Sequence, residues 1–105
     1  MATPVQINDL AATALFVRGG SCKLLGYSIY NPSNAAAYVQ FFDTLLGPTV
    51  GTTAPKWSIA LATLTSQTLN TVDLFFRDGL WVAATTTDDG SSAPSAALNV
   101  SLELS

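Results

Sequence analysis

The last eight residues of the chain alternate strictly between apolar and polar side chains. A β-strand places successive side chains on opposite faces, so this pattern predicts a strand with one buried and one exposed face. The apolar members are Leu98, Val100, Leu102 and Leu104, and the polar members are Asn99, Ser101, Glu103 and Ser105. No helix could gather these four apolar side chains on one face, so the pattern constrains the fold class more than any other feature.

A period of about two recurs along most of the chain, and turn residues separate the repeats. The further predicted strands span residues 13–18, 22–30, 38–44, 57–63, 72–77 and 80–85. About seven to eight short strands with regular turns predict an all-β fold, an antiparallel β-sandwich that is jelly-roll-like or a small barrel. Residues 35–37 and 61–69 keep a weak helical alternative open.

Asp78 and Gly79 separate two of the alternating runs. Asp-Gly is a strong signal for a type I′ turn, which needs positive φ at both central residues. We therefore predict that residues 72–77 and 80–85 form a hairpin and that Gly79 is structurally required.

The chain has 105 residues, a length that suits one domain with one hydrophobic core. We predict that residues 13–105 form a single sandwich domain. Residues 1–12 carry no charge except Asp9, and we expect them to form an N-terminal arm that becomes ordered on a partner.

Charged residues make up only 10% of the chain, against about 25% in ordinary soluble domains. So few charges favour association with other subunits, although abundant Ser and Thr hydroxyls could instead solubilise a monomer. The strand around residues 38–44 is apolar on both faces. We therefore expect a homo-oligomer, with Tyr38, Phe42, Trp57 and Trp81 at its subunit or partner interface. An aromatic platform that stacks sugars or bases is the alternative role for such side chains.

The sequence offers little for catalysis or metal binding. It has no histidine and one cysteine, Cys22, so no imidazole is present to activate a nucleophile. We expect no catalytic, cofactor-binding or metal site, and Cys22 is interpreted as a small apolar residue. A hydrolase with paired carboxylates is the enzyme alternative. Asp88-Asp89-Gly90 is read as a turn, because the ligand spacing of a calcium loop is missing.

Nucleic acid and membrane partners are not expected. Four basic residues and a net charge of −3 leave no cationic stripe to neutralise phosphates. The stretch 24–42 has no charge, but the turn at residues 31–34 interrupts it, so it does not suit a spanning helix. No basic residue precedes Arg18, so the charged start of a signal peptide is not seen.

Two stretches carry a family resemblance. Residues 25–43 read LGYSIYNPSNAAAYVQFFD, and residues 79–86 read GLWVAATT. In this order and spacing they resemble small bacteriophage virion structural proteins, in which a Gly-containing strand leads to an Asn-centred turn and an aromatic strand. These motifs belong to the scaffold and not to an active site.

The resemblance implies a non-enzymatic capsid decoration, or cement, protein that binds and stabilises the outer head shell. It also implies a homotrimer, the major capsid protein as partner, and a location on the phage head surface after synthesis in the host bacterial cytoplasm. The alternative is a carbohydrate- or receptor-binding β-sandwich module of a tail fibre or other tail part. For that alternative, Trp81 and the Asp88-Asp89 loop are the best candidates.

Overall fold

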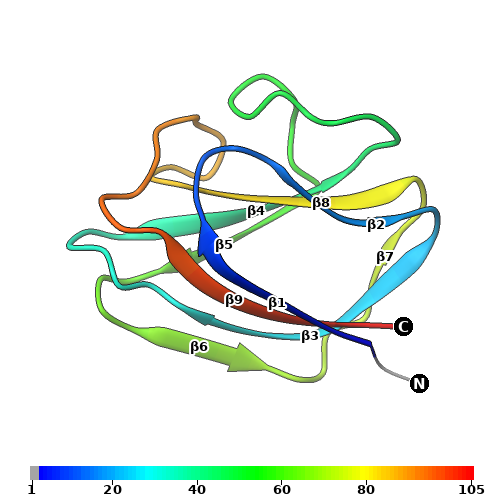
Figure 1. Cartoon of the computed structure of the whole chain (residues 1–105), viewed down its shortest axis with the longest axis horizontal. Helices are drawn as coiled ribbons and strands as arrows, with labels where there is room; N and C mark the ends of the chain where they lie inside the picture. Colours follow the sequence, from blue (N-terminus) through cyan, green and yellow to red (C-terminus); the bar gives the residue numbers. More distant parts are fainter. Residues whose placement is uncertain (1–2) are drawn as a thin grey trace.

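The computed structural model describes residues 3–105, which form nine β-strands in two antiparallel sheets (Figure 1). The regular elements of this range are all strands, which confirms the all-β sandwich. Their bounds are β1 Thr3–Leu10, β2 Leu15–Gly19, β3 Cys22–Tyr30, β4 Ala37–Asp43, β5 Trp57–Leu61, β6 Ser66–Leu69, β7 Leu74–Phe76, β8 Gly79–Thr85 and β9 Leu98–Leu104.

The strand order identifies the type of sandwich. Sheet A has the order β1-β9-β3-β6, with β7 also paired to β3, and sheet B has the order β2-β8-β4-β5. The strand pairs are nested inside one another, as in one long hairpin rolled over itself. From the innermost pair outward they are β4 with β5, β3 with β6 and β7, β2 with β8, and β1 with β9. This is the jelly-roll topology, so the jelly-roll prediction is confirmed for the described residues.

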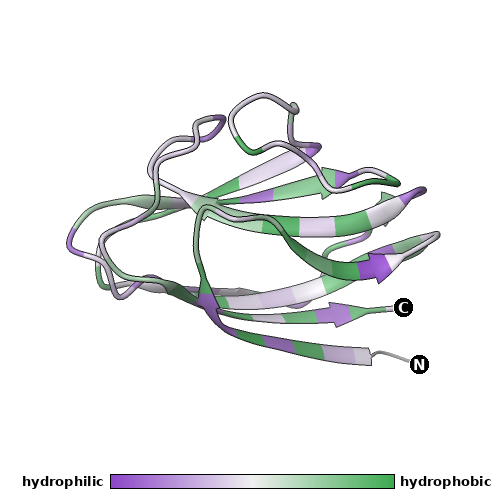
Figure 2. Ribbon diagram, turned by 45° about the horizontal axis from the view of Figure 1, so that its top comes forward, coloured by the Kyte–Doolittle hydropathy of each residue, from purple (hydrophilic) through white to green (hydrophobic). Residues whose placement is uncertain are grey.

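The core lies between the two sheets (Figure 2) and takes residues from every strand except β6, whose four residues are all exposed. The four apolar residues of β9 are at most 1% exposed, as their alternation predicts. In β3 the phase of the alternation shifts at a bulge between Leu24 and Gly26. Leu24 and Tyr27 therefore both face the core, and Leu25, which strict alternation would place on the same face as Tyr27, is only half-buried.

The predicted boundary between the N-terminal arm and the sandwich domain needs correction. Residues 3–10 of the expected N-terminal arm form β1, an edge strand of sheet A that pairs with β9 from Thr3 to Leu10. Val5 and Ile7 pack against the core, and Leu10 is fully buried, so these residues belong to the sandwich. Met1 and Ala2, the rest of that end, lie outside the described residues.

The helical alternatives are also wrong. Residues 61–69 hold the end of β5, a turn and β6, and Leu64 in that turn has a φ of 55°. Residues 35–37 form a bend and the start of β4.

The predicted hairpin at Asp78-Gly79 is wrong, although both of its strands exist. β7 pairs with β3 in sheet A, whereas β8 pairs with β2 and β4 in sheet B. The Asp78-Gly79 segment therefore crosses from one sheet to the other. A short turn signal cannot distinguish a hairpin from such a crossing, because both need a sharp reversal.

Gly79 is still required, for a different reason. A Cβ at this position would lie 2.9 Å from the carbonyl oxygen of Thr44 and 3.2 Å from that of Arg18, and the φ of Gly79 is +157°. The backbones of three segments meet here, and a side chain has no room.

Asn31 organises the opposite end of the sandwich from within the predicted turn. Its side chain is fully buried, and its Nδ2 donates to the carbonyl oxygens of Ala35, Leu61 and Ala62 over 3.0–3.3 Å. Its Oδ1 accepts from the backbone N–H and the hydroxyl of Ser33. One amide thus joins the β3–β4 turn to the end of β5.

Candidate interaction surface

The outer face of sheet B is covered by two long loops of the same chain, residues 44–56 and 86–97 (Figure 1). Gln40 on this face is fully buried, and its Nε2 donates to the carbonyl oxygens of Thr87 and Gly90 over 3.3 and 3.1 Å. The hydroxyl of Ser58 donates to the carbonyl oxygen of Asp88 over 2.9 Å. The loop 86–97 is therefore held to the sheet by hydrogen bonds from outward-facing side chains of β4 and β5.

Because these loops cover the outer face of sheet B, the expectation that Phe42 lies at a subunit or partner interface needs correction. Phe42 is 0% exposed but lies outside the core between the sheets, on the same outer face as Gln40. The strand is apolar on both faces because the chain buries both of them. Phe42 is therefore not available to a partner in this structure.

Trp81 lies on the same face, and its ring is half-buried. It packs edge to face with Phe16 of β2 at a centroid distance of 5.2 Å. The ring of Trp81 also contacts Gly47, where a Cβ would lie 3.3 Å from the ring. Trp81 thus packs against β2 and the loop 44–56.

Large apolar side chains remain exposed around Trp81. Phe16 is 59% exposed, and Leu45 and Leu46, which lead into Gly47, are 77% and 78% exposed. We refer to Phe16, Leu45, Leu46 and Trp81 as the apolar patch. Sequence reasoning identified only Trp81 of this set. Leu45 and Leu46 lie outside the strands, next to Gly47, where strand periodicity gives no signal, whereas Phe16 lies within β2.

Tyr38 and Trp57 are the other predicted interface residues, and both are half-buried. Tyr38 lies on the outer face of sheet B, between Ala60 and Thr85 in the strand register. Trp57 stacks on Phe41 at a centroid distance of 5.6 Å. Among residues 3–105, no ring contact joins Tyr38, Trp57 and Trp81 into one cluster.

Trp57 also lines an open cleft of about 320 Å³. The cleft lies between β5, the edge strand of sheet B, and the segment that leads into β7 of sheet A. Its lining residues are Lys56, Trp57, Val72, Asp73 and Leu74. Three of the five are apolar and pack with one side against the core, so the cleft exposes the margin of the sandwich interior.

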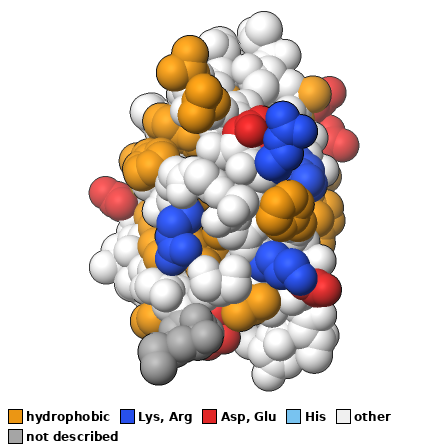
Figure 3. Space-filling model, turned by 90° about the vertical axis from the view of Figure 1, so that its right-hand side faces the viewer, with side chains coloured by type: hydrophobic (Ala, Val, Ile, Leu, Met, Phe, Trp, Pro, Cys, Tyr) orange, Lys and Arg blue, Asp and Glu red, His pale blue; other side chains and the backbone are white. Residues whose placement is uncertain are grey.

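The basic side chains of the described chain gather with acidic groups at the end of the molecule shown in Figure 3, among exposed hydrophobic side chains. Lys23 pairs with Asp73 at 3.3 Å, and Lys56 pairs with Asp43 at 3.7 Å. The remaining two also have partners, since Arg77 contacts Asp78 at 3.4 Å and Arg18 donates to the carbonyl oxygen of Ser105. This end is therefore close to neutral and is not a cationic surface.

Asp43 is the most strongly held of these carboxylates. It accepts hydrogen bonds from the backbone N–H groups of Arg77, Asp78 and Gly79. Burial alone would raise the pKa of Asp43, but these donors and the Lys56 ammonium together lower it. The carboxylate ties the crossing between the sheets to the end of β4, a structural role.

Cys22 belongs to the core and is 5% exposed. Burial raises the pKa of its thiol, which keeps it protonated. This agrees with its interpretation as a small apolar residue. Among residues 3–105, no three His, Cys, Asp or Glu side chains are grouped so that they could hold a metal ion. That part of the chain also contains no helix long and apolar enough to cross a membrane.

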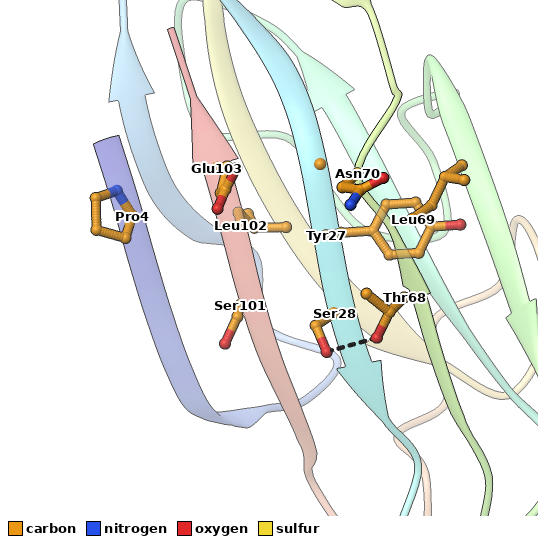
Figure 4. Close-up of a pocket in the computed structure, with 10 residues that line it drawn as sticks. Pro4, Tyr27, Ser28, Thr68, Leu69, Asn70, Ser101, Leu102 and Glu103 are labelled. Carbon is orange, nitrogen blue, oxygen red and sulfur yellow. Dashed lines mark hydrogen bonds between the residues drawn. The ribbon is translucent and has the colours of Figure 1, made fainter. Parts of the chain in front are cut away.

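The outer face of sheet A is polar and carries a small hollow of about 170 Å³ (Figure 4). Its floor is Gly26, where a Cβ would lie 2.9 Å from the carbonyl oxygen of Leu69. Ser28 and Thr68 share a hydrogen bond of 2.9 Å beside it, and Glu103 lies on its other side. Hydroxyl and carboxylate groups thus lie beside a mainly apolar lining that includes Pro4, Leu69 and Leu102.

Comparison with solved structures shows the fold. A structure described as Bacillus endospore appendages, a family of disulfide-linked pili, matches with a TM-score of 0.51 and 17% identity over 99% of this chain and 85% of that chain. PirA matches with a TM-score of 0.47 and 12% identity, over 97% of this chain and 92% of that chain. The coat protein of Tobacco streak virus matches with a TM-score of 0.45 and 9% identity, over 100% of this chain and 85% of that chain. No sequence-family model matches the chain, and no curated protein does.

Proposed function

We propose that this chain is a non-enzymatic structural protein of a bacteriophage virion, a capsid decoration protein that binds the major capsid protein and stabilises the outer head shell. The observation that carries the proposal is the apolar patch. The patch stays exposed, although the chain's own residues fill the core and its own loops cover the outer face of sheet B. Such exposed patches mark interaction surfaces in otherwise well-packed proteins.

The low charge content supports the same proposal. Only 10% of the residues are charged, and the four basic side chains are all engaged with groups of the same chain. A surface with so few free charges is suited to a permanent place among other subunits. The jelly roll itself is compatible with many functions, so it supports a rigid scaffold and does not name the partner.

The proposal includes a homo-oligomer, a trimer, on the phage head surface. Light scattering after size exclusion at micromolar concentration should give a multiple of 10.9 kDa. Mass spectrometry of phage particles purified from the source of the gene should detect the chain, and the recombinant protein should co-sediment with heads that lack it. Absence from purified particles together with failure to bind heads would overturn the virion function.

A carbohydrate-binding module of a tail part is the second candidate, and the hollow over Gly26 is the observation that favours it. Ser28, Thr68 and Glu103 present hydroxyl and carboxylate groups there, which could bond sugar hydroxyls. A glycan array probed with the isolated protein tests this function. A signal that Glu103→Gln removes would favour it over decoration.

A further inference from the structure

We propose that copies of this chain join through two different surfaces, with Leu45 and Leu46 of one copy seated in the cleft beside Trp57 of the next copy. The inference rests on the proposed function, and it names the two surfaces through which the oligomer forms. It differs from the interface expected from the sequence, because Phe42 is buried and the exposed Leu45 and Leu46 are not among the predicted residues.

The cleft is an apolar acceptor with enough room. Trp57, Val72 and Leu74 line it and pack with their other sides against the core. Its volume is about 320 Å³. A cavity of about 150 Å³ is known to hold one benzene molecule, so this cleft has room for roughly two leucine side chains.

Leu45 and Leu46 form the projecting part. They lie just after β4 and are 77% and 78% exposed. The loop that carries them has no charged residue between Asp43 and Lys56. Insertion of this loop into an apolar cleft therefore buries no unpaired charge, which would otherwise oppose the contact.

The rim of the cleft is also matched to an uncharged occupant. Lys56 is paired with Asp43 at 3.7 Å, and Asp73 is paired with Lys23 at 3.3 Å. Both rim charges are compensated within the chain and need no charged group from a partner. A second copy supplies the required uncharged apolar segment, so we commit to this occupant.

The symmetry follows from the fact that the two surfaces differ. A contact between a projection and a separate cleft is heterologous, and repeating it gives a closed ring or an open filament. Both surfaces adjoin the same end of the sandwich, since Leu45 lies just after the last residue of β4 and Trp57 is the first residue of β5. Any closed ring occupies every projection and every cleft, and the trimer of the proposed function is the ring of three.

Disulfide trapping tests the contact directly. In a Cys22→Ala background, Leu46→Cys and Asp73→Cys are prepared as separate proteins; Asp73 is 73% exposed, so its replacement should not disturb the fold. A disulfide forms only when the two Cα atoms come within about 7 Å. We expect mild oxidation of the mixture to give a cross-linked dimer, and each protein alone to give much less. Leu64→Cys, at another exposed leucine, replaces Leu46→Cys in the control mixture and should not cross-link.

The other outcomes overturn the inference in distinguishable ways. Rapid cross-linking of Leu46→Cys alone would show a symmetric contact between like surfaces. An oligomeric parent protein without the mixed cross-link would place the interface elsewhere and leave the proposed function intact. A parent protein that stays monomeric at micromolar concentration would remove this inference and the oligomer, while detection of the chain in phage particles would still support the virion function.

A substitution gives a second, independent measurement. Leu46→Asp should raise the dissociation constant of the oligomer by about 10- to 100-fold, because a large apolar side chain is replaced by a charge. Leu64→Asp should leave it unchanged. Equal effects of the two substitutions would contradict the inference.

Discussion

The carboxylate of Asp43 accepts a hydrogen bond of 2.8 Å from the backbone N–H of Asp78, although the two residues are 35 positions apart. Asp43 ends β4, and Asp78 lies between β7 and β8. This bond and those from Arg77 and Gly79 fix the point at which the chain leaves sheet A for sheet B. Much of the conformation at this end depends on this one side chain.

Asp43→Asn should destabilise the protein by about 1.5–3 kcal/mol at pH 7, because charge-assisted hydrogen bonds are replaced by weaker ones. Chemical denaturation measures the free energy of unfolding. Asp73→Asn is the control, since that carboxylate is 73% exposed and bridges only Lys23; it should change stability by less than about 1 kcal/mol. Equal losses would contradict the role of Asp43.

The pH dependence of stability should follow from the same carboxylate. The folded-state pKa of Asp43 is lowered below its ordinary value. Its contribution is therefore fully present above the unfolded pKa of about 3.9 and is lost as the pH falls through the folded pKa. Denaturation curves at a series of acidic pH values should show this loss in the parent protein and a smaller one in Asp43→Asn. Parallel profiles would rule out the linkage.

Gly79→Ala should destabilise the fold by roughly 2–4 kcal/mol, from the unfavourable φ and from contact with two carbonyl oxygens. Gly20→Ala is a matched comparison, because Gly20 has a φ of +74° but a Cβ added there would have no atom within 4 Å. It should cost only about 1–2 kcal/mol. Thermal unfolding of both variants separates backbone strain from steric overlap, and a greater loss at Gly20 would refute the close approach at Gly79.

Asn31→Asp should be severely destabilising at neutral pH, by about 3 kcal/mol or more. A carboxylate would face the carbonyl oxygens of Ala35, Leu61 and Ala62 in place of the amide that donates to them. Asn34→Asp, in the same turn but exposed, should have little effect. The loss at Asn31 should shrink at acidic pH, where a protonated carboxyl can donate one hydrogen bond. A mild effect at neutral pH would mean that the amide is not a structural link.

Phe42→Ala should cost about 3–5 kcal/mol in the free energy of unfolding, as for a buried core phenylalanine. Leu46→Ala should cost less than about 0.5 kcal/mol in the monomer, because the side chain is 78% exposed. Denaturation at concentrations below those of association compares the two. A small loss for Phe42→Ala would show that loops 44–56 and 86–97 do not bury this side chain in solution.

The sequence alone determined where most strands lie and which residues enter the core. Alternation located β3, β4, β8 and β9 to within one residue at either end, because the side-chain period of a strand is a local property of its backbone. It also identified Gly79 as a required glycine, since only a few residue types suit a sharp reversal. Alternation did not locate β6, because its residues are exposed on both sides and show no apolar-polar pattern.

Only the tertiary structure decided which strands pair and what covers each face. The Asp-Gly segment joins two sheets and not two adjacent strands, and Phe42 is buried by loops of its own chain and not by a partner. Alternation predicts that a side chain faces an apolar environment, but it does not identify the segment or partner that provides this environment. The answer depends on contacts between distant segments, such as Asp43 with Asp78 and Gln40 with Gly90, which form only when the whole sandwich closes.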